Sequence, residues 1–238
     1  MAAVNGSSRL WLVRHAQASF GSSDYDVLST RGEQQAERLA AWLVAHPELH
    51  FAHAVAGTLR RHTQTLAAIE HAFAANARPL PAIVQDSDWN EFDHDALIRA
   101  FAHLHPDDPV IAVARTGADR RAVHAVLAAS LHAWARGELD SCVPETWNAF
   151  GIRIARARAR LDAAPCGKIL VVSSAGAIAR CAQTALGCDA VHTVELNLAL
   201  RNTAISEFRD VSDDWRLHIW NMLPHLSAPA DRKWVTYY

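Results

Sequence analysis

The chain has 238 residues, half of them apolar and a fifth charged, which is typical of a globular protein with a large core. Its net charge of −2 argues against a strongly basic surface of the kind that binds nucleic acid or anionic membranes. No apolar run reaches the roughly 20 residues that span a bilayer, and no secretion signal is evident. Four cysteines without a Cys-x-x-Cys pair fit free thiols in the cytoplasm. We therefore expect a cytoplasmic protein without nucleic-acid or membrane partners.

Strand and helix signals alternate in the first part of the chain. An apolar run at residues 10–13 predicts a buried strand, and a polar loop at residues 18–28 follows it. Thr30 and Glu33 form a capping box at the start of a helix, whose apolar side chains share one face until Pro47. The elements expected next are a strand at residues 51–56, a helix that Thr58 caps and that runs to about residue 75, and a strand at residues 83–85.

Residues 92–144 are less regular, with helical stretches near 96–104 and 120–136. We interpret them as an insertion that forms a helical cap over one end of the sheet. The remaining elements are a helix at residues 145–162, a strand at 168–173, a turn at 174–176, a helix that Gly187 ends, and a hairpin of strands at 203–208 and 215–220 with its turn at 210–214.

Strands that alternate with helices predict one domain over residues 1–238, with a three-layer α/β fold. The sheet is expected to be mostly parallel, with helices on both faces. Ligands bind such sheets at the carboxyl ends of the strands.

Charged or small residues follow three of these strands. Arg14 and His15 end the first strand, although a strand that simply ends in polar residues explains them equally well. Arg61 lies at a helix start, where arginine and free backbone N–H groups suit phosphate, and a solvated surface arginine is the alternative. Ser174 and Ala175 form a small-residue turn that can cradle an anion, or a tight connection without a ligand.

In their order along the chain, these motifs resemble the histidine phosphatase superfamily, the phosphoglycerate-mutase-like proteins, over roughly residues 9–210. Residues 12–17, Leu-Val-Arg-His-Ala-Gln, are similar to the Arg-His-Gly signature of that family. The other similar segments are residues 28–36, 59–65, 90–92, 145–153 and 202–205. Residues 17–20 and 91–94 are similar to a subgroup of the family that has serine at position 174.

The resemblance implies a mechanism. His15 would be the nucleophile that forms a phosphohistidine, with its other ring nitrogen donating to a backbone carbonyl. Arg14 and Arg61 would clamp the phosphoryl oxygens. Glu91 would protonate the leaving oxygen and then help to activate water, with a pKa raised by burial. The remaining residues of the expected phosphate-binding set are Gln17, Ser174, Ala175 and His94. No metal or cofactor is implied.

Two residues depart from the family pattern. Ala16 replaces a glycine, which costs about 1 kcal/mol or shifts the loop where the backbone must turn tightly. Ser174 stands where the family has its second histidine. A serine hydroxyl can donate a hydrogen bond but cannot be cationic, and losing one donor can lower the rate ~10²–10³-fold. His94 is our first candidate to replace that histidine and His62 our second, although each fits a solvated surface histidine better.

Three functions therefore stay open. The first is a phosphatase that acts on a small phosphorylated metabolite. The second is a phosphate-binding or regulatory protein with little turnover, and the third is a phosphoglycerate-type mutase. The expected ligands are a small phosphorylated substrate or inorganic phosphate, and apolar strands near the C-terminus could pair two copies into a homodimer. His46, His50 and His53 do not predict a metal site, because Pro47 interrupts their helix.

Overall fold

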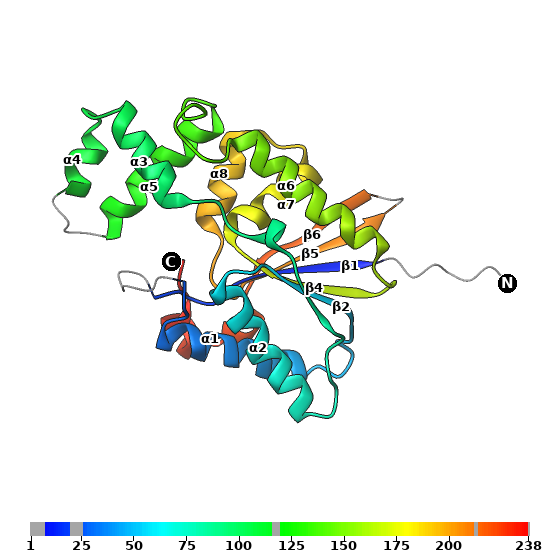
Figure 1. Ribbon diagram of the computed structural model, residues 1–238. Coiled ribbons are helices and arrows are strands. Elements are labelled where there is room, and N and C mark those ends of the chain that lie inside the picture. The colour runs from blue at the N-terminus through cyan, green and yellow to red at the C-terminus, as the bar shows by residue number, and fades with distance from the viewer. Residues whose placement is uncertain (1–7, 20–25, 116–119, 212–213, 238) are drawn as a thin grey trace.

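The computed structural model describes residues 8–19, 26–115, 120–211 and 214–237, and these form a six-stranded sheet between layers of helices (Figure 1). The strand order is β3-β2-β4-β1-β5-β6. The first four strands in this order are parallel, whereas β5 and β6 are antiparallel to their neighbours. The strands are β1 (Arg9–Arg14), β2 (Phe51–Ala56), β3 (Ile83–Gln85), β4 (Lys168–Ser173), β5 (Ile205–Val211) and β6 (Asp214–Met222). The expected mostly parallel α/β fold is confirmed.

Alternate side chains of β1 pack into different helical layers, as the two-residue period of a strand requires. Leu12 belongs to the same buried cluster as Ile178 of α7 (Ala175–Leu186). Val13 belongs to a second cluster with Leu39 of α1 (Thr30–Val44). Both faces of the sheet are therefore covered, which leaves the carboxyl ends of the strands as the place where polar groups can meet a ligand.

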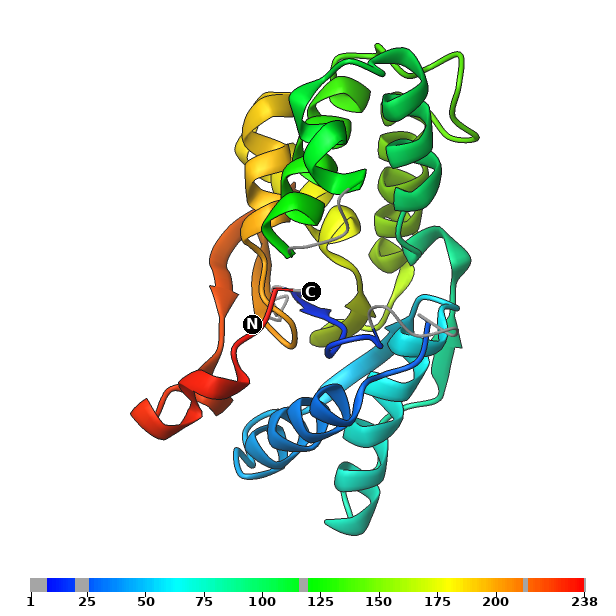
Figure 2. The same cartoon turned by 90° about the vertical axis from the view of Figure 1, so that its left-hand side faces the viewer.

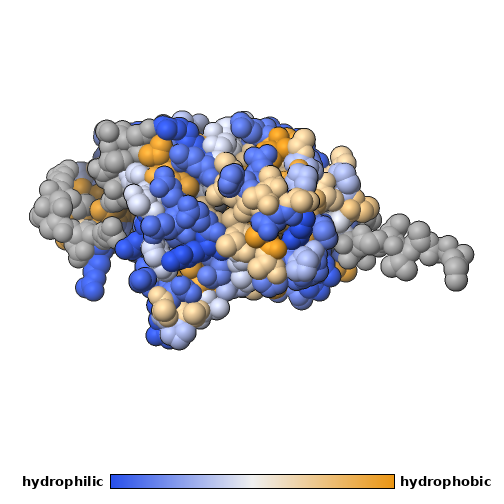
Figure 3. Space-filling view, turned by 90° about the horizontal axis from the view of Figure 1, so that it is seen from below, coloured by the Kyte–Doolittle hydropathy of each residue, from blue (hydrophilic) through white to orange (hydrophobic). Residues whose placement is uncertain are grey.

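Helices α1 and α2 (Arg60–Ala75) cover one face of the sheet side by side (Figure 1). The predicted capping box of Thr30 is wrong by one residue. Ser29 is the N-cap of α1, and its hydroxyl accepts from the amide of Gly32. Thr58 does not cap α2 either, because Leu59 occupies the N-cap position without a side-chain bond. Seen from the side of these helices, the surface is a mixture of hydrophilic residues and scattered apolar ones (Figure 3).

Helices α6 (Trp147–Arg160) and α7 cover the other face (Figure 1). Thr146 caps α6 by accepting from the amide of Ala149, so this helix begins two residues later than predicted. α7 begins at Ala175, directly after β4, and the predicted turn at residues 174–176 is therefore reduced to one residue. Gly187 ends α7 in the left-handed conformation, with φ of 63°.

Helices α3 (His94–Leu104), α4 (Pro109–Arg115) and α5 (Arg120–Ala135) stand beyond one end of the sheet and pack partly on α8 (Ala190–Ala199) (Figures 1 and 2). The sequence predicted α3 and α5, but not α4 or α8. The four short 3-10 helices of the described chain are Ser87–Trp89, Leu161–Ala163, Pro224–Leu226 and Pro229–Trp234.

The C-terminal segment returns to the middle of the molecule, between α1 and the upper helices (Figure 2). The side-chain amide of Gln35 donates to the carbonyl of Trp234 over 2.6 Å and to the hydroxyl of Thr236 over 2.7 Å. The amide of Asn202 donates to the carbonyl of Thr236 over 2.9 Å. These bonds fix the position of residues 234–237 beside the end of β1.

All four cysteines are free thiols. In the described ranges, no helix is both long and apolar enough to cross a membrane. The predicted hairpin of β5 and β6 is present, but its predicted turn at residues 210–214 is too long, because Asp210 pairs with Trp215 and Val211 with Asp214. Residues 212–213 lie outside the described residues. The same holds for residues 20–25 of the predicted loop at 18–28, and so for Phe20.

Candidate active site

His15 follows the last residue of β1, and its backbone is held from two sides. Its amide donates to the carbonyl of Ser173 on β4 over 2.8 Å, and its carbonyl accepts from the side chain of Asn202 over 3.1 Å. The parallel pairing of β1 with β4 thus places His15 at the carboxyl edge of the sheet. Only 5% of the residue is exposed, and this part faces a cleft.

The imidazole of His15 is held in one tautomer. Its Nδ1 lies 2.7 Å from the carbonyl oxygen of Ala16, which can only accept, so Nδ1 carries the proton and Nε2 does not. Burial lowers the pKa of His15 well below its usual value, and the positive charges of Arg61 and Arg14 lower it further. The ring is therefore neutral at neutral pH, with an unprotonated nitrogen available to attack phosphorus.

Arg14 and Arg61 supply the positive charge of the site. They are 9% and 6% exposed, so both cations are almost completely removed from water. The guanidinium group of Arg14 donates to the carbonyl of Leu200, and that of Arg61 to a carboxylate oxygen of Asp26 over 2.7 Å. Both groups line the same cleft as His15. Two anchored guanidinium groups in a poorly hydrated site favour the binding of a phosphoryl group.

Glu91 enters the cleft from the loop that precedes α3. One carboxylate oxygen accepts from the amide of Gly176 over 3.1 Å, and the other lies 3.4 Å from the amide of Phe92. Burial raises the pKa of the Glu91 carboxyl above its usual value, as the sequence predicted. A Cβ atom at position 176 would lie 2.3 Å from a Glu91 oxygen, so only glycine leaves room for this carboxyl group. An acid that holds its proton to higher pH can protonate a leaving oxygen.

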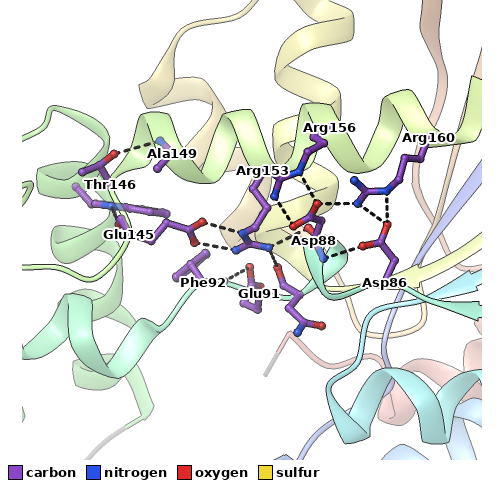
Figure 4. A network of polar contacts seen from close by, with 12 residues as sticks. Asp86, Asp88, Glu91, Phe92, Glu145, Thr146, Ala149, Arg153, Arg156 and Arg160 are labelled. Carbon is purple, nitrogen blue, oxygen red and sulfur yellow. Dashed lines mark hydrogen bonds and ion pairs between the residues drawn. The ribbon is translucent and has the colours of Figure 1, made fainter.

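Arg153 of α6 supports the loop that carries Glu91 (Figure 4). Its guanidinium group donates to both carboxylate oxygens of Glu145, over 2.7 and 2.8 Å, and to the carbonyls of Asp88 and Asn90, each over 2.9 Å. Two of these four bonds tie the loop to α6, and the other two hold the guanidinium group on Glu145. The segment at residues 145–153, which is similar to the family, therefore supports the loop that carries Glu91 through the contacts of Arg153.

Ser174 contacts a histidine, but from a different position than the sequence suggested. Its hydroxyl oxygen lies 2.6 Å from Nε2 of His62, and both residues are fully buried. The ring of His62 also lies 5.5 Å from the ring of His15. His94, our first candidate, lies in the cleft wall with its Nε2 3.4 Å from a carboxylate oxygen of Asp95. The prediction that His62 is a solvated surface residue is wrong.

The expected site residues fall into two groups. Six of them line one cleft, namely Arg14, His15, Arg61, Glu91, His94 and Ala175. Ser174 lies behind the cleft, on His62. Gln17 does not line it, and its side-chain oxygen lies 3.2 Å from the hydroxyl of Ser29.

The outer part of the cleft comes from the predicted cap at residues 92–144 and from two further elements that the sequence did not connect to the site. Its apolar lining is formed by Phe92, Ile98, Val123, Leu127, Leu198 and Tyr237. Asp95, His124 and Asn197 add polar groups. Leu198 and Asn197 lie on α8, which was not predicted, and Tyr237 lies in the C-terminal segment, so no local pattern pointed to them. Within the described ranges, no three His, Cys, Asp or Glu residues are grouped so that they could hold a metal ion.

Comparison with known proteins identifies the family. The histidine phosphatase superfamily (branch 1) matches residues 10–108 and 113–223. A search of curated proteins found no matching sequence. Similar solved structures include the mycobacterial glucosyl-3-phosphoglycerate phosphatase with inorganic phosphate, which is 19% identical, with a TM-score of 0.61 and coverage of 92% of this chain and 99% of that chain.

Two further structures share the fold. The alpha-ribazole phosphatase of Shigella flexneri is 19% identical, with a TM-score of 0.59 and coverage of 90% of this chain and 96% of that chain. A phosphoserine phosphatase mutant of Entamoeba histolytica in complex with phosphoserine is 17% identical, with a TM-score of 0.61 and coverage of 92% and 99%. Since the family match covers most of the sequence and the fold agrees with it, the chain belongs to the histidine phosphatase superfamily.

Proposed function

We propose that the protein is a phosphatase that hydrolyses a phosphomonoester of a small metabolite through a phosphohistidine on His15. The observation that carries the proposal is the bond from Nδ1 of His15 to the carbonyl of Ala16. It leaves Nε2 unprotonated in a cleft that also contains Arg14, Arg61 and Glu91. A nucleophile, two cations and a proton donor are the groups that a phosphoryl transfer to histidine requires.

The reaction has two steps. In the first, Nε2 of His15 attacks phosphorus, the bond from phosphorus to the ester oxygen breaks, and Glu91 gives its proton to the departing alkoxide. In the second, Glu91 takes a proton from water as the water oxygen attacks phosphorus, and the bond from phosphorus to Nε2 breaks. Arg14 and Arg61 balance the negative charge that grows on the phosphoryl oxygens in both steps.

The supporting observations favour hydrolysis over the mutase reaction. A phosphoglycerate carries a carboxylate besides its phosphate. Among the described residues that line the cleft, Arg14 and Arg61 are the only arginines or lysines, and both lie at the phosphoryl end. A phosphate-binding protein with little turnover stays the second candidate, because Ser174 lies behind the cleft and not in it.

The test is the hydrolysis of 4-nitrophenyl phosphate from pH 5 to 8 by the wild type, the His15→Ala variant and a His71→Ala control. His71 is exposed on α2, away from the cleft. We expect His15→Ala to abolish the activity and His71→Ala to leave it unchanged. If the reaction is quenched rapidly without acid, phosphate should also be found bound to the wild-type chain, but not to the His15→Ala variant.

Each other outcome argues against the proposal in its own way. Equal activity in the wild type and His15→Ala would exclude His15 as the nucleophile. Binding of inorganic phosphate without turnover or phosphohistidine would support the binding protein. Interconversion of phosphoglycerates without release of phosphate would support the mutase.

A further inference from the structure

The cleft above the phosphoryl site has an apolar wall. Ile98 of α3, Val123 and Leu127 of α5 and Leu198 of α8 line it. Val123 is 40% exposed, so an apolar side chain faces the open cleft. Large apolar side chains that face a pocket beside a polar centre are typical of a site that binds the apolar part of a ligand.

The charges in the cleft are unevenly distributed. Its described arginines, Arg14 and Arg61, lie at the end where His15 is, whereas Asp95 lies in the wall. The carboxyl group of Asp95 is mostly exposed, and it adds negative charge where the organic part of a substrate would lie. Besides His94, His124 and Asn197, a second anionic group on the substrate would thus meet an apolar wall and a carboxylate, and none of the described arginines or lysines.

We infer that the substrate is the phosphomonoester of an alcohol with an apolar alkyl or aryl group and without a second anionic group. This inference rests on the proposed phosphatase function only in calling the ligand a substrate. A binding experiment without turnover can test which ligands the cleft prefers. In the bound state, the phosphoryl group lies between Arg14 and Arg61, and the organic group covers Leu127 and Val123.

Binding of n-alkylphosphonates from ethyl to hexyl, measured by isothermal titration calorimetry, tests the inference without turnover. The carbon–phosphorus bond is not hydrolysed, and the headgroup is constant along the series. We expect the Kd to fall about two- to fourfold for each added methylene group. A carboxylate at the end of the propyl chain should weaken binding at least tenfold relative to propylphosphonate.

Variants locate the effect in the cleft. Val123→Asn and Leu127→Asn should flatten the dependence of Kd on chain length and leave the Kd of ethylphosphonate within twofold of the wild type. Ile152→Asn is the matched control, because Ile152 is exposed on α6 and does not line the cleft. A Kd independent of chain length, or tighter binding of the carboxylate, would overturn the inference while 4-nitrophenyl phosphate hydrolysis still proceeds. If chain length matters but no phosphate ester is hydrolysed, the proposed function fails and the inference stands.

His62 supports a second, independent inference. Its ring is fully buried between Ser174 and His15, and Nδ1 has no hydrogen-bond partner. Gly57 makes room for it, since a Cβ atom there would lie 2.2 Å from Nδ1. A buried polar side chain that contacts both Ser174 and His15 is expected to have a role in the reaction.

The hydrogen bonds indicate which nitrogen of His62 carries the proton. A buried N–H without an acceptor is rarer than a buried acceptor without a donor, so Nδ1 is bare and Nε2–H donates to the Ser174 oxygen. The hydroxyl proton of Ser174 is then available for another acceptor. The hydroxyl makes no capping bond on α7, and the next residue, Ala175, lines the cleft.

The geometry points to His62 as a positioning residue that orients the Ser174 hydroxyl and the His15 ring for phosphoryl transfer. Like the reaction itself, this role rests on the proposed function. We expect His62→Ala and Ser174→Ala each to lower kcat about 10- to 100-fold with little change in KM. Because the two residues act as a pair, the double variant should be no slower than the slower single variant.

An exchange of the two positions separates positioning from mere packing. Ser174→His alone should be slow, because the new ring meets His62. When Ser174→His is combined with His62→Ala, the kcat of the double variant should be at least tenfold higher than that of His62→Ala alone. The imidazole at position 174 then fills the volume that His62 occupied. No recovery, or additive losses in the double alanine variant, would overturn the inference. The ¹⁵N signals of the His15 ring report the same contact without turnover, and they should change in His62→Ala but not in His71→Ala.

Discussion

Nδ1 of His15 donates its proton to the carbonyl oxygen of Ala16 over 2.7 Å, and the same residue, Ala16, is bound to α2 through its amide. This amide donates to the hydroxyl of Thr65 over 3.0 Å, and the hydroxyl donates to the carbonyl of Arg61 over 2.7 Å. The tautomer of the proposed nucleophile and the position of Arg61, a proposed phosphate-binding residue, are therefore set by one chain of hydrogen bonds. The alanine that departs from the family pattern lies at its centre.

We expect Ala16→Gly to lower the free energy of unfolding by about 0.5–1 kcal/mol. Ala16 is not among the described non-glycine residues with positive φ, so a glycine gains nothing from its extra freedom there. Its methyl group is buried with Leu28 and Ala36, and this contact would be lost. Urea unfolding of the variant and the wild type measures the difference. A stabilised variant would show that the alanine strains the loop, as the sequence alone suggested.

Stability should decrease as the pH falls below about 6.5. Burial lowers the pKa of His15, His62 and His225, the last to about 4. In the unfolded chain these rings bind protons near pH 6.5, whereas in the folded chain they do not, so protonation favours unfolding. The change for His225 alone corresponds to roughly 3 kcal/mol between pH 6.5 and pH 4.

Urea midpoints at pH 7.5, 6.5 and 5.5 measure this dependence. Below pH 6.5, His225→Gln should reduce the slope of the unfolding free energy against pH by the contribution of one proton, or ~1.4 kcal/mol per pH unit. The lowered pKa of His15 should also affect the pH dependence of catalysis. Since Arg14, Arg61 and His62 face the ring and burial lowers its pKa, the acid limb of kcat/KM should lie well below pH 6.5. An acid limb above pH 6.5 would contradict the neutral nucleophile.

The proposed role of Glu91 as the proton donor to the leaving oxygen predicts a dependence of the rate on the leaving group. Glu91→Gln cannot protonate the departing oxygen, and an alkoxide needs that proton far more than 4-nitrophenolate does. In a single turnover, which reports the first step alone, we expect the variant to release the alcohol of an alkyl phosphate ~10²–10⁴-fold more slowly than the wild type, and 4-nitrophenol less than tenfold more slowly. Equal losses for both substrates would show that Glu91 acts on some other step.

The position of Glu91 also predicts the effect of Gly176→Ala. The added methyl group would lie 2.3 Å from a carboxylate oxygen of Glu91 and 2.6 Å from the ring of Phe92. The carboxyl group must therefore move, and kcat should fall more than tenfold. Gly151→Ala is the control, because the atoms nearest to its methyl group belong to the far end of the Arg180 side chain, away from Glu91. Wild-type kcat in Gly176→Ala would show that the carboxyl position is not critical.

Much of the sheet was predictable, because buried parallel strands are short apolar runs. The bounds of β2, β3 and β4 agree with the sequence, and β1 is longer than predicted by only one residue at each end. α8 escaped prediction because His192, Thr193, Glu195 and Asn197 interrupt the apolar spacing of its ten residues.

The contacts within the site were less predictable than its residues. Arg14, His15 and Arg61 follow predicted strands, so the edge of the sheet brings them together. His62 meets Ser174 across 112 residues of sequence, through the packing of α2 beside the end of β4. No pattern within α2 reveals which of its histidines points to the sheet. Our preference for His94 followed from the expectation that its segment borders the pocket, and His94 does line the cleft.

Arg153 shows how a residue outside the cleft should affect turnover. Its fork binds Glu145 through two parallel bonds and also holds the carbonyls of Asp88 and Asn90 (Figure 4). Lysine has the charge but not the planar fork, so Arg153→Lys leaves carbonyls of the Glu91 loop without a donor. We expect a loss of about 2 kcal/mol in unfolding free energy and at least a tenfold lower kcat.

Arg156→Lys is the matched control for this prediction. Arg156 also binds a carboxylate through two bonds, to Asp88, and holds the pKa of Asp88 at about 2. Its side chain is 60% exposed, however, and exposed ion pairs contribute little. The control should unfold at the urea midpoint of the wild type and stay within twofold of its kcat. If both lysine variants behave alike, the bonds of Arg153 to the backbone do not position Glu91, and other contacts hold the loop, among them the packing of Trp89 and Phe92 and the bond from the Ser173 hydroxyl to the carbonyl of Trp89.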